Sequence, residues 1–63
     1  MSEREVYFEF LVVGGAVKVV AIDSETAIEV TVMGPASASE ADMKQLALRK
    51  LKARLAREGD QKP

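Results

Sequence analysis

Few side chains in this sequence could carry out catalysis. The 63 residues include four serines but no histidine and no cysteine. A Ser-His-Asp triad is therefore excluded, and so are a thiolate nucleophile, a zinc site built on cysteines and a disulfide. Glu9 and Glu29 could exchange protons, but we expect both on the solvated face of a sheet, on either side of Val20. We predict that the chain is not an enzyme and that it holds no cofactor and no metal.

Two glycine-containing segments could be mistaken for phosphate-binding loops. Gly14-Gly15 joins two predicted strands, so no helix N-terminus follows it to bind a phosphate. Residues 34–39 do lead into a predicted helix. However, Glu40 and Asp42 stand in the first turn of that helix, where they complement the helix dipole and repel anions. We therefore interpret this second segment as a helix cap.

The β-branched aliphatic residues divide the chain into two compositions. All eight valines and both isoleucines lie between Val6 and Val32, and beyond Gly34-Pro35 the apolar residues are alanine, leucine and methionine. Valine and isoleucine favour strands, whereas alanine and leucine favour helices. We predict an α+β fold, a three-stranded antiparallel β-meander with one C-terminal helix packed on one face (β-β-β-α).

We expect a single small domain over residues 1–63, with an ordered core at about 4–58 and a frayed tail at 59–63. The first residues mix charges of both signs, unlike the basic start of a secretory signal. No segment approaches the run of about 20 apolar residues that a membrane-spanning helix needs. These features predict a cytoplasmic protein without membrane association.

Gly14-Gly15 predicts the first hairpin, because a two-residue type I′ turn needs positive φ at both central positions. A hairpin closed there gives four apolar pairs: Val13 with Ala16, Val12 with Val17, Phe10 with Val19, and Phe8 with Ala21. Apolar partners across neighbouring strands support this register. We expect Phe10 near the middle of the buried face.

The turn-forming segment Asp23-Ser24-Glu25-Thr26 predicts the second hairpin. As a four-residue loop it gives three further pairs on the same face: Ala21 with Ile28, Val19 with Val30, and Val17 with Val32. If Ala27 instead adopts a left-handed conformation as part of the turn, the pairing shifts through a bulge. A three-stranded meander follows in either case.

Two overlapping capping boxes, which start at Ser37 and Ser39, precede the predicted helix, and the sequence leaves the choice between them open. We expect the helix to continue to about Arg57, with Gly59 just past its end. Its apolar stripe should cover the buried face of the sheet and comprises Ala47, Leu48, Leu51 and Leu55, with Met43 at the border.

The charge of the chain is unevenly distributed. The net charge is −1, but residues 1–34 carry −4 and residues 35–63 carry +3. A near-neutral total gives no general attraction to nucleic acid. An alternative function, weak nucleic-acid binding, would depend on the basic residues of the predicted helix, namely Arg49, Lys50, Lys52, Arg54 and Arg57.

The element order resembles that of the double-stranded-RNA-binding domain without its first helix. The segment SEADMKQLALRKLKARL at residues 39–55 is loosely similar to the second helix of that family. In the family this helix begins with lysines that contact phosphates. This chain has Glu40 and Asp42 there, and only Lys44 is basic. The resemblance therefore does not extend to the residues that would bind RNA.

Nearly the whole chain also resembles a family of short uncharacterised bacterial proteins, mostly from alphaproteobacteria. The shared segments are EVYFEF from residue 5, VKVVAID from residue 17, EV near Val30, GPA from residue 34 and ALRKL from residue 47. Automated labelling sometimes names members of this family serine hydroxymethyltransferase, an enzyme that needs a large pyridoxal-phosphate fold and a Schiff-base lysine. The resemblance implies a bacterial origin and supplies no catalytic residues.

The outer face of the predicted sheet is more apolar than a solvated face usually is. Its apolar residues include Tyr7, Leu11, Val20, Ile22 and Met33. One helix covers one face only, so we predict a homodimer. We favour stacking on this outer face, and pairing of an edge strand to extend the sheet is the alternative. An unidentified protein partner is the alternative occupant. The sequence thus indicates a small non-catalytic structural or protein-interaction module that associates with itself.

Overall fold

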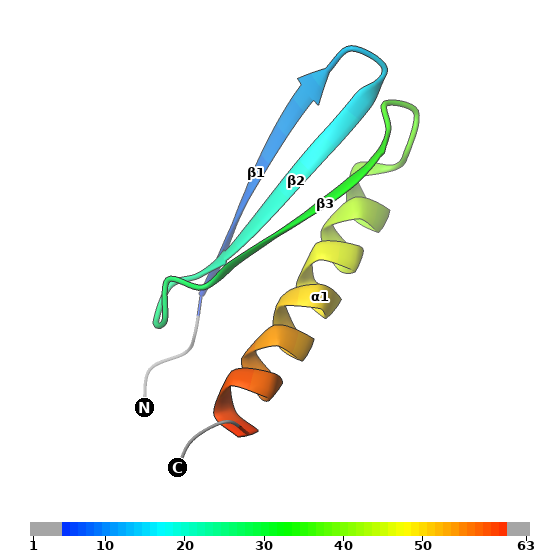
Figure 1. Cartoon of the computed structure of the whole chain (residues 1–63). Helices are drawn as coiled ribbons and strands as arrows, with labels where there is room; N and C mark the ends of the chain where they lie inside the picture. The colour runs from blue at the N-terminus through cyan, green and yellow to red at the C-terminus, as the bar shows by residue number, and fades with distance from the viewer. Residues whose placement is uncertain (1–4, 61–63) are drawn as a thin grey trace.

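The structure is a computed structural model that describes the backbone of residues 5–60 and the side chains of residues 5–58. Its elements are β1 (Val6–Val13), β2 (Ala16–Asp23), β3 (Glu29–Pro35) and α1 (Glu40–Asp60). The strands form one antiparallel sheet in the order β1-β2-β3, and α1 lies across one face of it (Figure 1). The predicted β-β-β-α meander is confirmed. Residue 4 and residues 61–63, which were assigned to the core and the tail, lie outside the described residues.

The first hairpin has the predicted register, with Val13 opposite Ala16 and Phe10 opposite Val19. Gly14 has a φ of 60°, a left-handed value that glycine adopts without steric strain. Gly15 does not share this left-handed φ, so the turn has the φ pattern of type II′ rather than the predicted type I′. Both turn types close a two-residue hairpin, and the register is therefore the same.

The second hairpin is shifted by two residues from the pairing that the four-residue loop predicted. Val30 lies opposite Ala21, not opposite Val19. Ala27 has a φ of 63°, which is the left-handed conformation that the sequence left open as an alternative. Side chains alternate between the two faces of a strand, so a shift of two residues keeps each side chain on its predicted face.

Asp23 is the reason for this shift, because it ends the ladder instead of opening the loop. Its buried carboxylate accepts hydrogen bonds from the Thr26 amide at 2.9 Å and from the Thr26 hydroxyl at 2.8 Å. The Asp23 amide donates to the Ile28 carbonyl at 2.9 Å, and the Ala27 amide donates to the Asp23 carbonyl at 2.8 Å. An aspartate that bonds the backbone a few residues later is a common way to fix a turn.

Ser39 caps α1. Its hydroxyl accepts a hydrogen bond from the Asp42 amide at 3.2 Å, and its carbonyl accepts one from the Met43 amide at 3.0 Å. Of the two serines that the sequence left open, Ser39 is therefore the N-cap residue. The helix extends to Asp60, so Gly59 lies inside it and not past its end as predicted.

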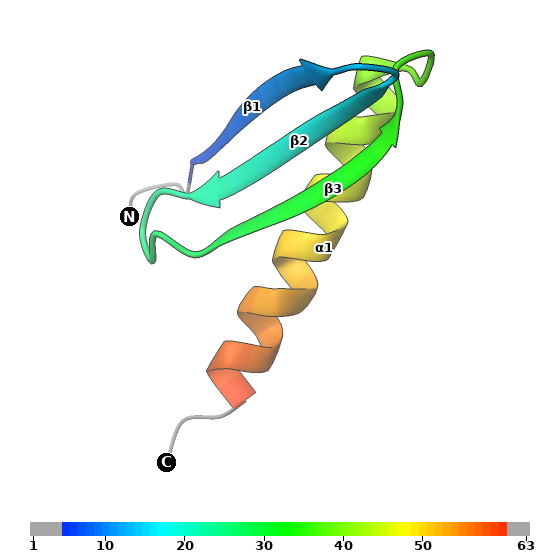
Figure 2. The ribbon, with the colours of Figure 1, turned by 45° about the horizontal axis from the view of Figure 1, so that its top comes forward.

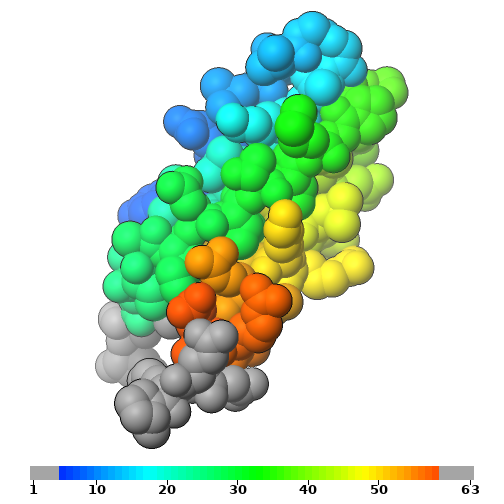
Figure 3. Space-filling view, in the orientation of Figure 1, coloured from blue at the N-terminus to red at the C-terminus, as the bar shows by residue number. Residues whose placement is uncertain are grey.

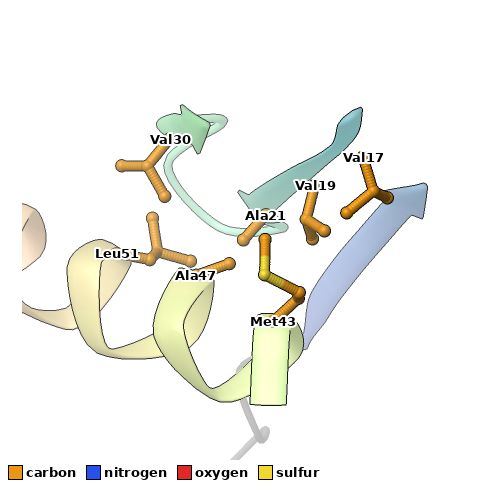
Figure 4. Close-up of a cluster of buried hydrophobic side chains, with 7 residues drawn as sticks. All are labelled: Val17, Val19, Ala21, Val30, Met43, Ala47 and Leu51. Carbon is orange, nitrogen blue, oxygen red and sulfur yellow. The ribbon is translucent and has the colours of Figure 1, made fainter. Parts of the chain in front are cut away.

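The core lies between α1 and the strands β2 and β3. Seven buried apolar side chains meet there (Figure 4): Val17, Val19, Ala21, Val30, Met43, Ala47 and Leu51. Met43 stands inside this cluster and not at its border, because Gly34 leaves room for it: a Cβ atom on Gly34 would lie 2.9 Å from the Met43 sulfur. Leu48 and Leu55, which were predicted in the buried stripe, are only partly buried.

The helix covers β2 and β3 and leaves most of β1 uncovered. Figures 2 and 3 show α1 along the β3 side of the sheet, with β1 at the opposite margin. A helix is about 10 Å wide and strands are about 4.8 Å apart, so one helix covers about two strands. As a result Phe10 is only partly buried at the margin of the core, not at its middle as predicted, and Val12 is 73% exposed.

Candidate interaction surfaces

The outward side of β1 has no partner among the residues that the structure describes. In an antiparallel pair, successive residues direct their backbone N–H and C=O groups alternately toward the neighbouring strand and away from it. The Ser24 amide donates to the Glu5 carbonyl at 2.9 Å, so the odd-numbered residues of this strand bond β2. The even-numbered residues direct their N–H and C=O groups outward, and we call them the open edge: Val6, Phe8, Phe10 and Val12.

Part of the open edge is covered by the flank of α1. The ammonium nitrogen of Lys44 lies 5.2 Å from the centroid of the Phe8 ring, within the range of a cation–π contact. Val6, Phe8 and Phe10 are partly buried beside the core. Side chains of the open edge therefore pack against the apolar core on the helix face of the sheet, whereas the outward backbone side of the strand is exposed.

A small notch opens next to the open edge, where α1 begins. It encloses about 150 Å³ and is lined by Phe10, Val12, Val17, Ala36, Ala38, Glu40 and Met43. A dry cavity of about 150 Å³ is large enough for one aromatic ring. Glu40 is the single ionisable side chain in this wall, so the notch suits an apolar group better than a reacting one.

The other edge of the sheet is partly closed. The Ala36 amide donates to the Gly15 carbonyl at 2.9 Å, so the odd-numbered residues of β3 direct their backbone groups outward. The ammonium nitrogen of Lys50 donates to the outward carbonyl of Thr31 at 2.9 Å, and Pro35 has no N–H group to donate. Lysine and proline at an edge hinder pairing with a further strand. β1 is therefore the edge that is better able to accept another strand.

The five residues predicted for self-association lie together on the outer face, but they do not form one exposed patch. Tyr7, Leu11 and Met33 are exposed, whereas Ile22 is partly buried and Val20 is only 7% exposed. Val20 lies on the central strand, between the side chains of β1 and β3. The middle of the group, at Val20 and Ile22, therefore offers little surface to a partner.

Tyr7 forms a local contact on the outer face. Its hydroxyl donates a hydrogen bond to a carboxylate oxygen of Glu5 at 2.9 Å. This hydrogen bond, together with the negative charge of Glu5, raises the pKa of the Tyr7 hydroxyl above its ordinary value of 10.0. The pair gives the outer face a titratable group whose charge changes only in strongly alkaline solution.

The five basic residues of the alternative nucleic-acid function do not share one face. Lys50 bonds the backbone of β3, and the Arg54 guanidinium pairs at 3.1 Å with the glutamate four residues later. Arg49 and Lys52 border a shallow hollow on the helix surface, and Arg57 is exposed near the end of α1. Two of the five side chains are thus engaged within the molecule.

The candidate acid–base pair is not brought together. Glu9 and Glu29 are both exposed on the outer face, on β1 and β3, with β2 between them. Two strand spacings amount to about 10 Å, which is too far for direct proton exchange. Among residues 5–58, no three His, Cys, Asp or Glu side chains gather as metal ligands would. Within the described chain, α1 is not apolar enough to cross a membrane.

One family model, Domain of unknown function (DUF6898), matches residues 3–58. The match covers nearly the whole length of the chain. The chain belongs to this family. No curated protein and no solved structure matches it. The bacterial origin that the sequence resemblance implies is not tested by this match and stays a prediction.

In this DUF6898 domain, the open edge is the feature that the residue patterns missed. The alternation of apolar residues placed Phe8 and Phe10 on the correct face, but it did not show how much of that face the helix covers. A two-residue hairpin with Val13 opposite Ala16 makes the odd-numbered residues of β1 the bonded ones. From this alternation, the sequence could have predicted that the backbone N–H and C=O groups of the even-numbered residues point away from β2.

Proposed function

We propose that this chain is a small, non-catalytic protein-interaction module that associates with itself as a homodimer. The main support for this proposal is that α1 leaves part of the sheet uncovered. α1 packs on β2 and β3, while Phe8 and Phe10 of β1 stay partly exposed beside the exposed Val12. Association is favourable when a partner removes such apolar surface from water, and exposed apolar patches commonly mark interaction sites.

The small size of the core supports the same proposal. Eight apolar side chains are buried among the described residues, and two of them are alanines. A domain of about 60 residues buries a modest share of its surface, so the favourable free energy of burial only narrowly exceeds the cost in conformational entropy. Oligomerisation is one of the ways in which small domains gain further burial.

The proposal excludes an enzymatic role. The sequence has no histidine or cysteine, and the notch beside the open edge has Glu40 as its single carboxylate. Catalytic sites usually combine a concave pocket with several polar groups whose pKa values are perturbed. A ligand or a metal that stays bound to the purified protein would contradict this part of the proposal.

Sedimentation equilibrium over about a hundredfold range of concentration tests the self-association. We expect the average mass to rise toward that of two chains. The melting temperature should rise with concentration as well, because a dimer that is coupled to folding is stabilised by mass action. The mass of one chain at every concentration, with a melting temperature that does not change, would rule out the homodimer.

Weak nucleic-acid binding through the basic helix is the alternative function, and the geometry supports it less. Lys50 and Arg54 already have partners within the molecule. Fluorescence titration with short single- and double-stranded RNA and DNA at low and moderate salt distinguishes the two functions. Phosphate contacts would make the affinity fall steeply with added salt. No binding at micromolar protein and low salt is the result that we expect.

A further inference from the structure

We infer that two copies of this chain pair their β1 strands, antiparallel and along the open edge, to form one continuous six-stranded sheet around a two-fold axis. The inference rests on the proposed self-association and adds the surface and the geometry of the dimer. It differs from the outer-face stacking that the sequence favoured.

The first support is the backbone of the open edge. Its four residues direct their N–H and C=O groups away from β2, and no hydrogen bond from the described part of the chain reaches them. A strand with the same spacing of outward groups satisfies all of these groups in an antiparallel ladder. On β3 the corresponding positions include Pro35 and the bonded carbonyl of Thr31, so the two edges are not equivalent.

The second support is self-complementarity without a like-charge contact. None of the open-edge side chains is charged. When Phe10 lies on the two-fold axis, it faces the partner's Phe10, and Glu9 faces the partner's Leu11. A register with Glu9 on the axis would place two carboxylates directly opposite each other, which is destabilising. We assign the register that is centred on Phe10, because it avoids this contact and pairs Phe8, Phe10 and Val12 of one copy with the same three residues of the other.

The third support is the notch at the start of α1. In the register centred on Phe10, the partner's Phe8 lies opposite Val12, on the face of the sheet that carries the helix. Val12 and Phe10 line the notch, whose volume of about 150 Å³ matches one aromatic ring. The partner's Phe8 is therefore placed next to an apolar hollow of suitable size.

The unequal edges also explain why the assembly closes at two chains. A two-fold β1–β1 contact uses the same edge of both copies, so only the two β3 strands remain at the margins of the sheet. Lys50 and Pro35 hinder further strand addition at these margins. The predicted product is a discrete dimer, not a fibre.

Two neighbouring valines provide a matched pair of variants. Val12 is 73% exposed and Val13 is 64% exposed, and their side chains lie on opposite faces of β1. Neither substitution disturbs a buried side chain of the monomer. Val12→Lys places a charge in the contact with the partner's Phe8 and should raise the dissociation constant by about tenfold or more, because the cost of desolvating a buried charge can exceed what a nearby carboxylate such as Glu40 returns. Val13→Lys should change that constant by less than about threefold, because its charge stays in solvent.

Spin labels on single cysteines test the geometry independently, since the sequence has no cysteine of its own. Glu9 and Thr31 are both exposed on the outer face and are each aligned with Val20. In the six-stranded sheet, labels at Thr31→Cys should be about 20 Å farther apart between the two copies than labels at Glu9→Cys. Stacking through the outer faces would give similar distances at the two positions.

The possible outcomes separate this inference from the proposed function. A dimer that is weakened by Val12→Lys alone and has the shorter label distance at Glu9 supports β1 pairing. A dimer that is weakened more by Val13→Lys, or equally by both variants, or that has equal label distances, overturns the inference while the homodimer stands. A wild-type chain that is monomeric overturns both the β1 pairing and the homodimer, even if a strand of another protein binds the open edge.

Discussion

The loop between β2 and β3 depends on two residues, Asp23 and Ala27. Asp23 is a buried acidic residue at the end of a strand, and its carboxylate holds the Thr26 backbone and side chain. Ala27 has a left-handed φ of 63°, which is costly for a residue with a Cβ atom. The hydrogen bonds of Asp23 thus stabilise a conformation that alanine would not adopt readily by itself.

Ala27→Gly should stabilise the protein. Removing the Cβ atom relieves about 1–2 kcal/mol of backbone strain, and the greater freedom of glycine in the unfolded chain offsets part of this gain. We expect a net increase of about 0.5–1 kcal/mol in the free energy of unfolding, measured by urea denaturation. Ala53→Gly, at an exposed position of α1, is the control and should lower that free energy by about 1 kcal/mol. Destabilisation by both variants would show that the φ of Ala27 carries no strain.

Tyr7 gives a prediction about pH. Its pKa is raised in the folded state, so its hydrogen bond to Glu5 stabilises the fold below the ordinary tyrosine pKa of 10.0. That contribution is lost as the pH rises through the folded-state pKa. Glu5→Gln keeps an acceptor but removes the charge, and it should lower the pKa of Tyr7 toward 10.0. The chain has one tyrosine and no tryptophan, so ultraviolet absorbance follows this group alone. Equal titration midpoints in the two proteins would contradict the contact.

At the scale of elements, the sequence predicted best where one residue pair determines the geometry. Gly14-Gly15 allows one close hairpin, and the pairing of β1 with β2 is as predicted. The second hairpin was predicted with the wrong pairing, because the side chain of Asp23 could open a loop or end a ladder equally well. Likewise, the apolar stripe of α1 indicated which helix residues face the sheet but not which two strands they cover, so the exposure of Phe10 was missed.

The start of α1 gives a prediction at this scale. Ser39→Ala should lower the free energy of unfolding by about 1 kcal/mol, because the Asp42 amide loses its hydrogen-bond acceptor. Ser37→Ala is the matched control and should change the stability by less than about 0.5 kcal/mol, since Ser37 is exposed outside the helix. Thermal and urea melts at equal protein concentration provide the comparison. A larger loss from Ser37→Ala would mean that Ser37, and not Ser39, is the N-cap residue.

At the scale of the whole molecule, the position of one helix on three strands leaves the sheet with two unequal edges. α1 covers β2 and β3 and also closes the β3 edge through Lys50. The same placement leaves β1 with an apolar face that is partly covered and an edge that is unpaired among the described residues. A second copy would supply both a strand and an apolar face, so the proposed two-fold dimer would satisfy both needs at once.

Amide hydrogen exchange, followed by NMR at several protein concentrations, detects the pairing of two β1 strands at the backbone itself. In a monomer the outward amides of Phe8, Phe10 and Val12 exchange fast, whereas the amides of Glu9 and Leu11 are protected by β2. We predict that protection of the three outward amides rises with concentration, in parallel with the dimer fraction, while the two inward amides stay protected throughout. Fast exchange of the outward amides at concentrations where sedimentation shows a dimer would contradict it.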